Sequence, residues 1–252
     1  MLKVFQSDKK VLSIYTVAGF PKLNDTMPIL KALQDSGVDM IELGMPYSDP
    51  LADGPIIQKA AMQAIENGMT LKLLFEQIAD LKSNIHIPVL LMGYVNTVMQ
   101  YGIENFCKDA QKCGITGVIL PDLPYEIYTK DFKTIFNQYG LFNVFLVTPQ
   151  TSPVRIQMLD NATEGFLYLV SSASTTGNNK GVADSETYLQ RIQNMQLQSK
   201  KVVGFNIKNK ETYDFACKYA DGAIIGSAFV QHLQNLSGDL SSGIQNFISL
   251  IR

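Results

Sequence analysis

The sequence has few of the residues that build metal centres, disulfides or membrane spans. Its 252 residues include only three cysteines and two histidines. Cys107, Cys113 and Cys217 form no CxxC pair and are odd in number, so we expect reduced thiols in a cytoplasmic protein. His86 and His232 lie far apart in the chain, which disfavours a zinc or iron site. No apolar run approaches the roughly 20 residues that a membrane helix requires.

An excess of charge of one sign is also missing. The formal net charge is −2, and the chain has no basic run. Nucleic acid is therefore not an expected partner. An anionic small molecule stays compatible with this charge, because backbone amides can bind phosphate without a positive net charge.

What the sequence does contain is a series of eight short apolar runs with amphipathic stretches between them. Continuous apolar runs are typical of parallel strands that are covered on both faces. The runs begin at Val11, Val38, Pro88, Thr116, Leu141, Gly165, Lys201 and Gly222. No GxGxxG follows the first run, which disfavours an open dinucleotide-binding sheet, and eight strands suit closure. We predict one (β/α)8 domain, a TIM barrel, over residues 1–252, with additional N-terminal and loop helices.

The stretches between the apolar runs have helical periodicity. In the first, Asn24 or Asp25 is the expected N-cap and Gly37 the expected stop. The second carries apolar residues at spacings of three and four, which indicates a core-facing helix. The clearest helical spans are 23–37, 69–83, 125–140 and 211–222.

The segment IELGMPYSDPLADGPIIQKA, from Ile41 to Ala60, carries the strongest chemical signal. Glu42 stands inside an apolar run, where burying a carboxylate is costly unless it is paired or protonated. Asp53 follows in a proline-rich loop. Two carboxyl groups in different surroundings can titrate apart, so that one acts as an acid while the other stays ionised. Two structural alternatives stay open: backbone amides could satisfy Glu42, and Asp53 could cap the next helix.

This segment strongly resembles the signature of tryptophan synthase α chains, E-L-G-x-P-[FY]-S-D-P-x-A-D-G-P. The resemblance continues in VLLMGYVNTVMQYGI from Val89, GVILPDLPYEI from Gly117, YLVSSASTTG from Tyr168 and GAIIGSAFV from Gly222. It implies a lyase that cleaves indole-3-glycerol phosphate to indole and glyceraldehyde 3-phosphate by a retro-aldol step. It also implies an α2β2 tetramer in which indole passes to the β subunit. Pyridoxal phosphate is then expected only in that β partner, and no cofactor in this chain.

The resemblance assigns roles to individual residues. Glu42 matches the family's catalytic glutamate, which protonates C3 of the indole ring. Asp53 matches the aspartate that accepts a hydrogen bond or proton from the indole N–H, and Tyr168 matches a tyrosine beside the glycerol chain. The expected apolar wall around indole consists of Tyr15, Leu91 and Phe205.

Phosphate is expected at the last strand ends, where barrels commonly bind it with loops and a helix N-terminus. The candidates are Gly177, Gly204, Asn206, Gly226 and Ser227. Here the chain departs from the common pattern. Ser172 and Ser174 replace an arginine and a glycine of the S-R-x-G-x-T-G loop, and Asn206 stands where many relatives have glycine. The composition of residues 171–184 fits a mobile lid or an ordinary surface loop.

Three rival functions were weighed against this interpretation. A metal-dependent epimerase on the same fold would need histidine and aspartate ligands at strand ends. The synthase that forms indole-glycerol phosphate would need lysines at strand C-termini, whereas Lys201 lies at a strand start. The rival from another class is a catalytically weak phosphosugar-binding barrel that acts mainly as a regulatory partner. The joint presence of Glu42, Asp53 and Tyr168 favours the enzyme.

Overall fold

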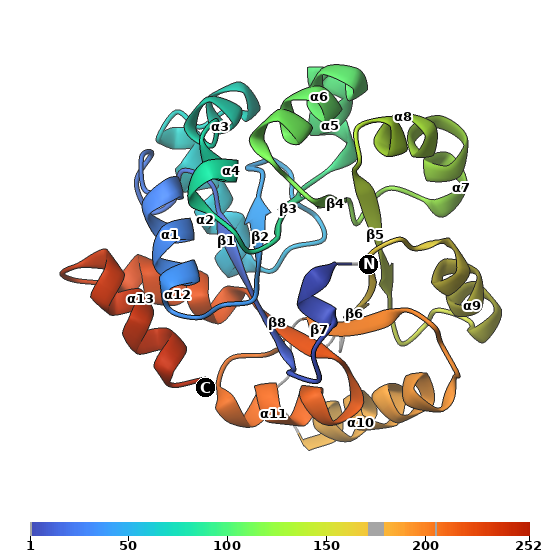
Figure 1. The fold of residues 1–252 in the computed structure, drawn as a ribbon. Helices are drawn as coiled ribbons and strands as arrows, with labels where there is room; N and C mark the ends of the chain where they lie inside the picture. Colours follow the sequence, from blue (N-terminus) through green and yellow to red (C-terminus); the bar gives the residue numbers. More distant parts are fainter. Residues whose placement is uncertain (1, 171–178, 205) are drawn as a thin grey trace.

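Eight parallel strands close into a barrel that is surrounded by helices (Figure 1). The computed structural model describes residues 2–170, 179–204 and 206–252. β1 pairs with both β2 and β8, which closes the sheet. The strands are β1 (Val11–Val17), β2 (Met40–Gly44), β3 (Val89–Met92), β4 (Gly117–Ile119), β5 (Phe142–Val147), β6 (Phe166–Val170), β7 (Lys200–Gly204) and β8 (Gly222–Ile225). The predicted TIM barrel is confirmed, and each strand overlaps its predicted run.

Helices connect the strands on the outside of the barrel. A 3-10 helix, η1 (Lys3–Phe5), precedes β1, and the others are α1 (Thr26–Asp35), α2 (Pro55–Glu66), α3 (Leu71–Gln77), α4 (Leu81–Asn84), α5 (Val95–Tyr101), α6 (Ile103–Cys113), α7 (Tyr125–Ile127), the π-helical η2 (Tyr128–Phe132), α8 (Lys133–Gln138), α9 (Pro153–Ala162), α10 (Asn179–Asn194), α11 (Lys210–Tyr219), α12 (Ser227–Asn235) and α13 (Leu240–Ser249).

Several helix boundaries differ from the prediction. The span 69–83 is divided into α3 and α4, and the span 125–140 contains the π-helical turn η2. Asp25 is the N-cap residue of α1, but its carboxylate accepts a hydrogen bond from the Lys22 amide rather than from the helix. α11 ends at Tyr219, because Gly222 already begins β8. α10 begins at Asn179, so the loop predicted over 171–184 is shorter, and residues 171–178 lie outside the described residues.

The register of the strands decides which side chains point into the barrel. Tyr15 on β1 pairs with Glu42 on β2, and Glu42 pairs with Leu90 on β3. Paired residues of neighbouring strands point to the same face of a sheet. Glycines on this face make room for tyrosine rings: a Cβ atom on Gly44 would lie 2.3 Å from Tyr15 Oη, and one on Gly204 would lie 2.2 Å from Tyr168 Oη. Tyr15, Glu42 and Tyr168 therefore share the barrel interior.

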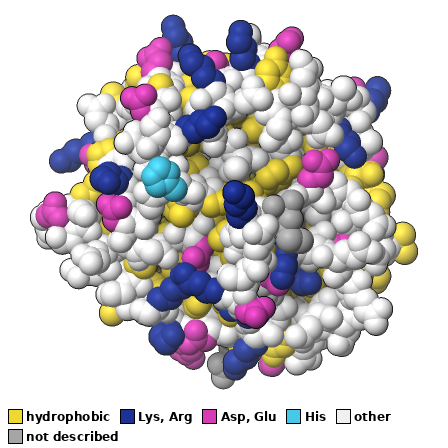
Figure 2. Space-filling view, in the orientation of Figure 1, with side chains coloured by type: hydrophobic (Ala, Val, Ile, Leu, Met, Phe, Trp, Pro, Cys, Tyr) yellow, Lys and Arg dark blue, Asp and Glu magenta, His cyan; other side chains and the backbone are white. Residues whose placement is uncertain are grey.

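The amino-terminal end of the barrel is covered. Phe5 of η1 packs against Phe166, the first residue of β6, with ring centroids 5.9 Å apart. In Figure 1, η1 lies over the centre of the barrel. Figure 2 shows lysine and arginine side chains interspersed with acidic ones over this same view. A site is therefore expected at the opposite, carboxyl end of the strands. Among the described residues, no helix is long and apolar enough to cross a membrane.

Candidate active site

Glu42 is a carboxyl group enclosed by the barrel wall. Its side chain on β2 has no exposed surface. Oε1 accepts a hydrogen bond from Ser13 Oγ at 3.4 Å, and Oε2 has no partner within the described part of the chain. Backbone amides therefore do not satisfy it, contrary to the structural alternative. Burial raises the pKa of Glu42 to about 8, and the Ser13 hydrogen bond opposes this rise. Near neutral pH the group keeps its proton and can act as an acid.

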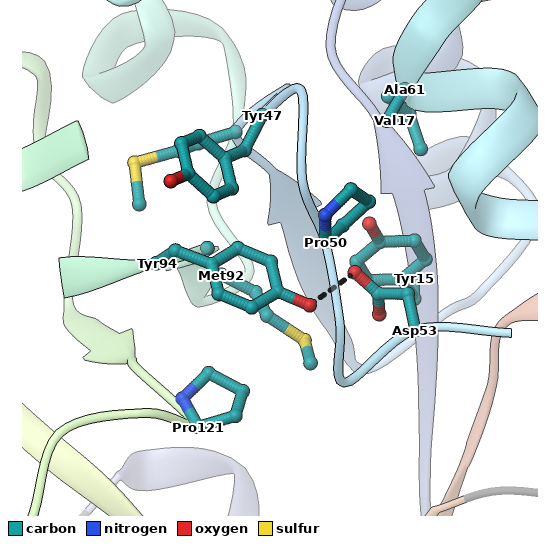
Figure 3. A pocket seen from close by; sticks show the side chains of 11 residues that line it. Tyr15, Val17, Tyr47, Pro50, Asp53, Ala61, Met92, Tyr94 and Pro121 are labelled. Atoms are coloured by element: carbon teal, nitrogen blue, oxygen red, sulfur yellow. Dashed lines mark hydrogen bonds between the residues drawn. The ribbon is translucent and has the colours of Figure 1, made fainter. Parts of the chain in front are cut away.

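Asp53 lies in the loop between β2 and α2 and is held by Tyr94. Tyr94 Oη donates to Asp53 Oδ2 at 2.9 Å (Figure 3). The N–H of Ala52 donates in turn to Tyr94 Oη at 3.0 Å. The N-cap of α2 is Gly54, without a side-chain cap, so Asp53 does not cap the helix. Burial raises the pKa of Asp53, and the hydrogen bond from Tyr94 lowers it.

Tyr94 itself is fixed by a second tyrosine. Its ring lies 5.2 Å from the ring of Tyr47, centroid to centroid, and Asn96 Nδ2 donates to Tyr47 Oη at 3.3 Å. Burial and the Asp53 charge both raise the pKa of Tyr94, so the phenol keeps the proton that it donates. Sequence reasoning missed Tyr47 and Tyr94. The available signal was their position in segments that directly follow β2 and β3.

A pocket opens between these loops at the carboxyl end of the barrel. Figure 3 shows Tyr15, Tyr47, Asp53, Met92 and Tyr94 around it, together with Pro50 and Pro121. The apolar wall was predicted to contain Leu91, and this was wrong by one residue. Met92 pairs with Gly44 on the inner face, whereas Leu91 pairs with Leu43 on the outer face. The predicted Phe205 lies outside the described residues.

Tyr168 joins the same electrostatic environment from β6. Its side chain is buried, and it does not line the open pocket. Burial raises the pKa of Tyr168, and the charges of Glu42 and Asp53 raise it further. Burial, Asp53 and Glu42 act on Tyr15 in the same direction. The fold thus brings together four predicted residues from three strands and one loop: Tyr15, Glu42, Asp53 and Tyr168.

The predicted phosphate residues occupy the ends of the last strands. Gly204 ends β7, and Gly226 is the N-cap of α12, whose first residue is the exposed Ser227. Asn206 has a φ of 59°, and it is the only residue other than glycine with positive φ among those described. It therefore adopts the left-handed conformation that favours glycine. Gly177, Ser172 and Ser174 lie outside the described residues.

In the described part of the chain, no three side chains of His, Cys, Asp or Glu lie close enough together to hold a metal ion. Cys107, Cys113 and Cys217 are buried and unpaired.

Comparison with known proteins gives a consistent match over the whole length. The family model described as tryptophan synthase alpha chain matches residues 1–251. A tryptophan synthase alpha chain from Flavobacterium johnsoniae is 53% identical over 98% of this chain and 97% of its own length. One from Parabacteroides distasonis is 50% identical, covering 92% and 91%.

Solved structures agree. The tryptophan synthase A-subunit from Pyrococcus furiosus superimposes with a TM-score of 0.86 at 30% identity, covering 100% of this chain and 99% of that one. The tryptophan synthase subunit alpha from Campylobacter jejuni gives 0.85 at 31% identity, covering 98% and 97%. The chain belongs to the tryptophan synthase α chain family.

Proposed function

We propose that Glu42 and Asp53 perform the reaction of this family member, a carbon–carbon lyase that cleaves indole-3-glycerol phosphate to indole and glyceraldehyde 3-phosphate. The observation that carries the assignment of Glu42 is its burial without a charged partner among the described residues, which keeps a carboxylic acid protonated near neutral pH. A positioned acid of this kind typically contributes about 10²- to 10⁴-fold to a rate.

The chemistry balances with one proton-carrying group. Glu42 gives its proton to C3 of the indole ring, which turns the ring into an electron sink. The hydroxyl on the adjoining glycerol carbon then loses its proton, its C–O bond becomes an aldehyde, and the electrons of the broken C–C bond restore the aromatic ring. The Glu42 carboxylate formed in the first step then accepts that hydroxyl proton, which returns the group to its acid form.

Asp53 stabilises the charge that develops at the ring nitrogen. A carboxylate facing the N–H gains interaction energy as the nitrogen becomes positive, so it acts most strongly in the transition state. The Tyr94 hydrogen bond favours the ionised form of Asp53, which this role requires. In this proposal, Tyr15 and Met92 supply apolar surface for the ring, and Tyr168 contacts the glycerol chain. Gly204, Asn206, Gly226 and Ser227, with Gly177, bind the phosphate, for which the N-terminus of α12 offers unpaired amides.

The partner assignment follows from family membership. A β subunit is implied, and we propose the α2β2 stoichiometry and transfer of indole to that subunit. The reaction requires no cofactor on this chain, and pyridoxal phosphate belongs to the β partner. We also propose a cytoplasmic location, as expected for an enzyme of amino-acid biosynthesis. A purely regulatory barrel would have no use for a buried, uncompensated carboxyl, because such a group destabilises the fold.

Indole release from indole-3-glycerol phosphate tests the proposal. The wild type and Glu42→Gln are compared with and without a β subunit, and binding of the substrate is measured by calorimetry. We expect release by the wild type and a loss of about 10²- to 10⁴-fold in the variant, with binding retained. If the wild type released no indole under either condition, the lyase assignment would fall. If Glu42→Gln kept full activity, the acid would have to be another residue.

A further inference from the structure

The barrel buries one hydroxyl group directly beside Glu42. Ser13 lies on the inner face of β1 with no exposed surface. Its strand neighbours are Met40 on β2 and Ile224 on β8, both apolar. Its hydroxyl finds one partner in the described part of the chain, Glu42 Oε1 at 3.4 Å. An alanine would fill this place without a polar atom to satisfy, so packing alone does not explain a serine here.

The hydrogen bond from Ser13 is the side-chain contact, among the described residues, that favours the ionised form of Glu42. Among the described residues, Tyr15 on β1 and Tyr168 on β6 interact electrostatically with Glu42, and both are neutral phenols. Asp53 acts on the same two tyrosines and is acidic, so none of these groups brings a positive charge to Glu42. β3 contributes only Leu90 at this level. Among the described residues, the Ser13 hydroxyl is the one side chain that lowers the pKa of Glu42, against the rise caused by burial.

A hydroxyl suits a group that changes its protonation state during turnover. Serine can donate to a carboxylate and can accept from a carboxylic acid, and its proton rotates between the two arrangements. Lysine or arginine would hold Glu42 ionised and prevent it from giving a proton. The contact uses Oε1 only, and Oε2 has no hydrogen-bond partner among the described residues.

We propose that Ser13 is a positioning residue of the lyase reaction: its hydroxyl holds Oε1 of Glu42 and stabilises the carboxylate that remains after each proton transfer. This role rests on the proposed function. It also divides the carboxyl group, with Oε1 fixed by the protein and Oε2 exchanging the proton with the substrate.

The test combines a titration of the ligand-free protein with kinetics. In Ser13→Ala, only one oxygen atom is removed, so the fold should persist, and thermal unfolding verifies it. The infrared carbonyl band of protonated Glu42 is identified as the band that disappears in Glu42→Gln. Without the donor, this band should persist to higher pH than in the wild type. Ser13→Thr, which keeps the hydroxyl, should restore the original midpoint.

The kinetic expectation has a separate signature. Ser13→Ala should lower kcat about ten-fold, the low end for a hydrogen bond to a charged group, with KM within two-fold, because Ser13 does not touch the substrate. The alkaline limb of the pH–rate profile should move to higher pH by the same amount as the midpoint of the infrared titration. An unchanged midpoint in Ser13→Ala would overturn the proposal. A shifted midpoint in a protein that releases no indole would instead overturn the proposed function and the catalytic role of Ser13, and leave only the hydrogen bond.

Discussion

At the scale of the single residue, catalysis and stability make opposite demands on Glu42. The folded barrel holds the carboxyl away from water, which raises its pKa from 4.5 to about 8. The folded state then binds the proton more tightly than the unfolded state does. Stability from this group is fully present below pH 4.5 and is lost as the pH rises through about 8. The acid that the reaction needs is therefore a cost to the fold at alkaline pH.

Glu42→Gln should remove this cost. Relative to the wild type, the variant should gain unfolding free energy on the order of 4 kcal/mol between pH 5 and pH 9. Urea unfolding of both proteins at the two pH values measures the difference. A wild type whose stability relative to the variant did not fall with pH would show that Glu42 titrates normally, and the argument for a buried acid would fail.

Tyr94 is the residue whose role depends most on a contact between two loops. Tyr94→Phe removes the donor to Asp53 and the acceptor of the Ala52 N–H, and it keeps the ring. We expect kcat/KM to fall about ten-fold, as for other hydrogen bonds to charged groups. Because the Tyr94 hydroxyl lowers the pKa of Asp53, the loss of that hydroxyl should also move the acid limb of the pH–rate profile to higher pH.

The matched control for this variant is Tyr47→Phe. It keeps the stacked ring and loses only the contact with Asn96, so kcat/KM should stay within about two-fold. Equal losses in the two variants would mean that the phenol network orders the loop in general, without a specific effect on Asp53.

At the scale of the element, large side chains on the inner face of the barrel pack directly against glycines of the neighbouring strands. Gly204 was predicted to belong to the phosphate site, and the structure shows a second demand, because a Cβ atom on it would lie 2.2 Å from Tyr168 Oη. Gly204→Ala should destabilise the fold by about 1 to 3 kcal/mol through overpacking. Gly226→Ala, whose Cβ would have its nearest neighbour at 3.6 Å, should cost much less. Thermal unfolding compares the pair, and equal losses would contradict the packing argument.

The strands were predictable because a parallel strand covered on both faces must be continuously apolar, and each such run proved to contain one. The division of the span 69–83 into the two helices α3 and α4 was not predictable. The apolar positions predicted the side that faces the core: Leu74, Phe75, Ile78 and Leu81 are buried, and Leu71 is partly buried. Two short helices satisfy that pattern as well as one long helix does. The Tyr94–Asp53 contact joins residues 41 positions apart. It depends on how two loops meet, and local periodicity carries no information on that.

At the scale of the whole molecule, the two ends of the barrel differ in what they expose. Among the described residues, five large apolar side chains are exposed in the segments that leave the barrel at its carboxyl end, after β2, β3, β4 and β5: Leu51, Met62, Met99, Ile127 and Val154. Single exposed apolar residues are ordinary, but a series around one opening is typical of a contact surface. Leu250 is also exposed, but it lies near the amino end of the barrel. Arg252, two residues further on, donates hydrogen bonds to the carbonyls of Lys10 and Gly37, which precede β1 and β2.

This asymmetry predicts where the β subunit docks. Leu51 and Val154 are each 82% exposed, and Leu250 is 73% exposed, so the three offer matched substitutions. Leu51→Asp and Val154→Asp should each weaken binding to the β subunit about ten-fold, because they place a charge in a surface that must lose water on docking. Leu250→Asp should leave binding unchanged. Calorimetric titration gives the affinities. We also expect the β subunit to raise the rate of indole release, and the β concentration needed for this rise should increase in the first two variants only. The reverse pattern, with Leu250→Asp alone impaired, would place the partner at the amino end of the barrel, where η1 closes it and indole could not pass directly between the subunits.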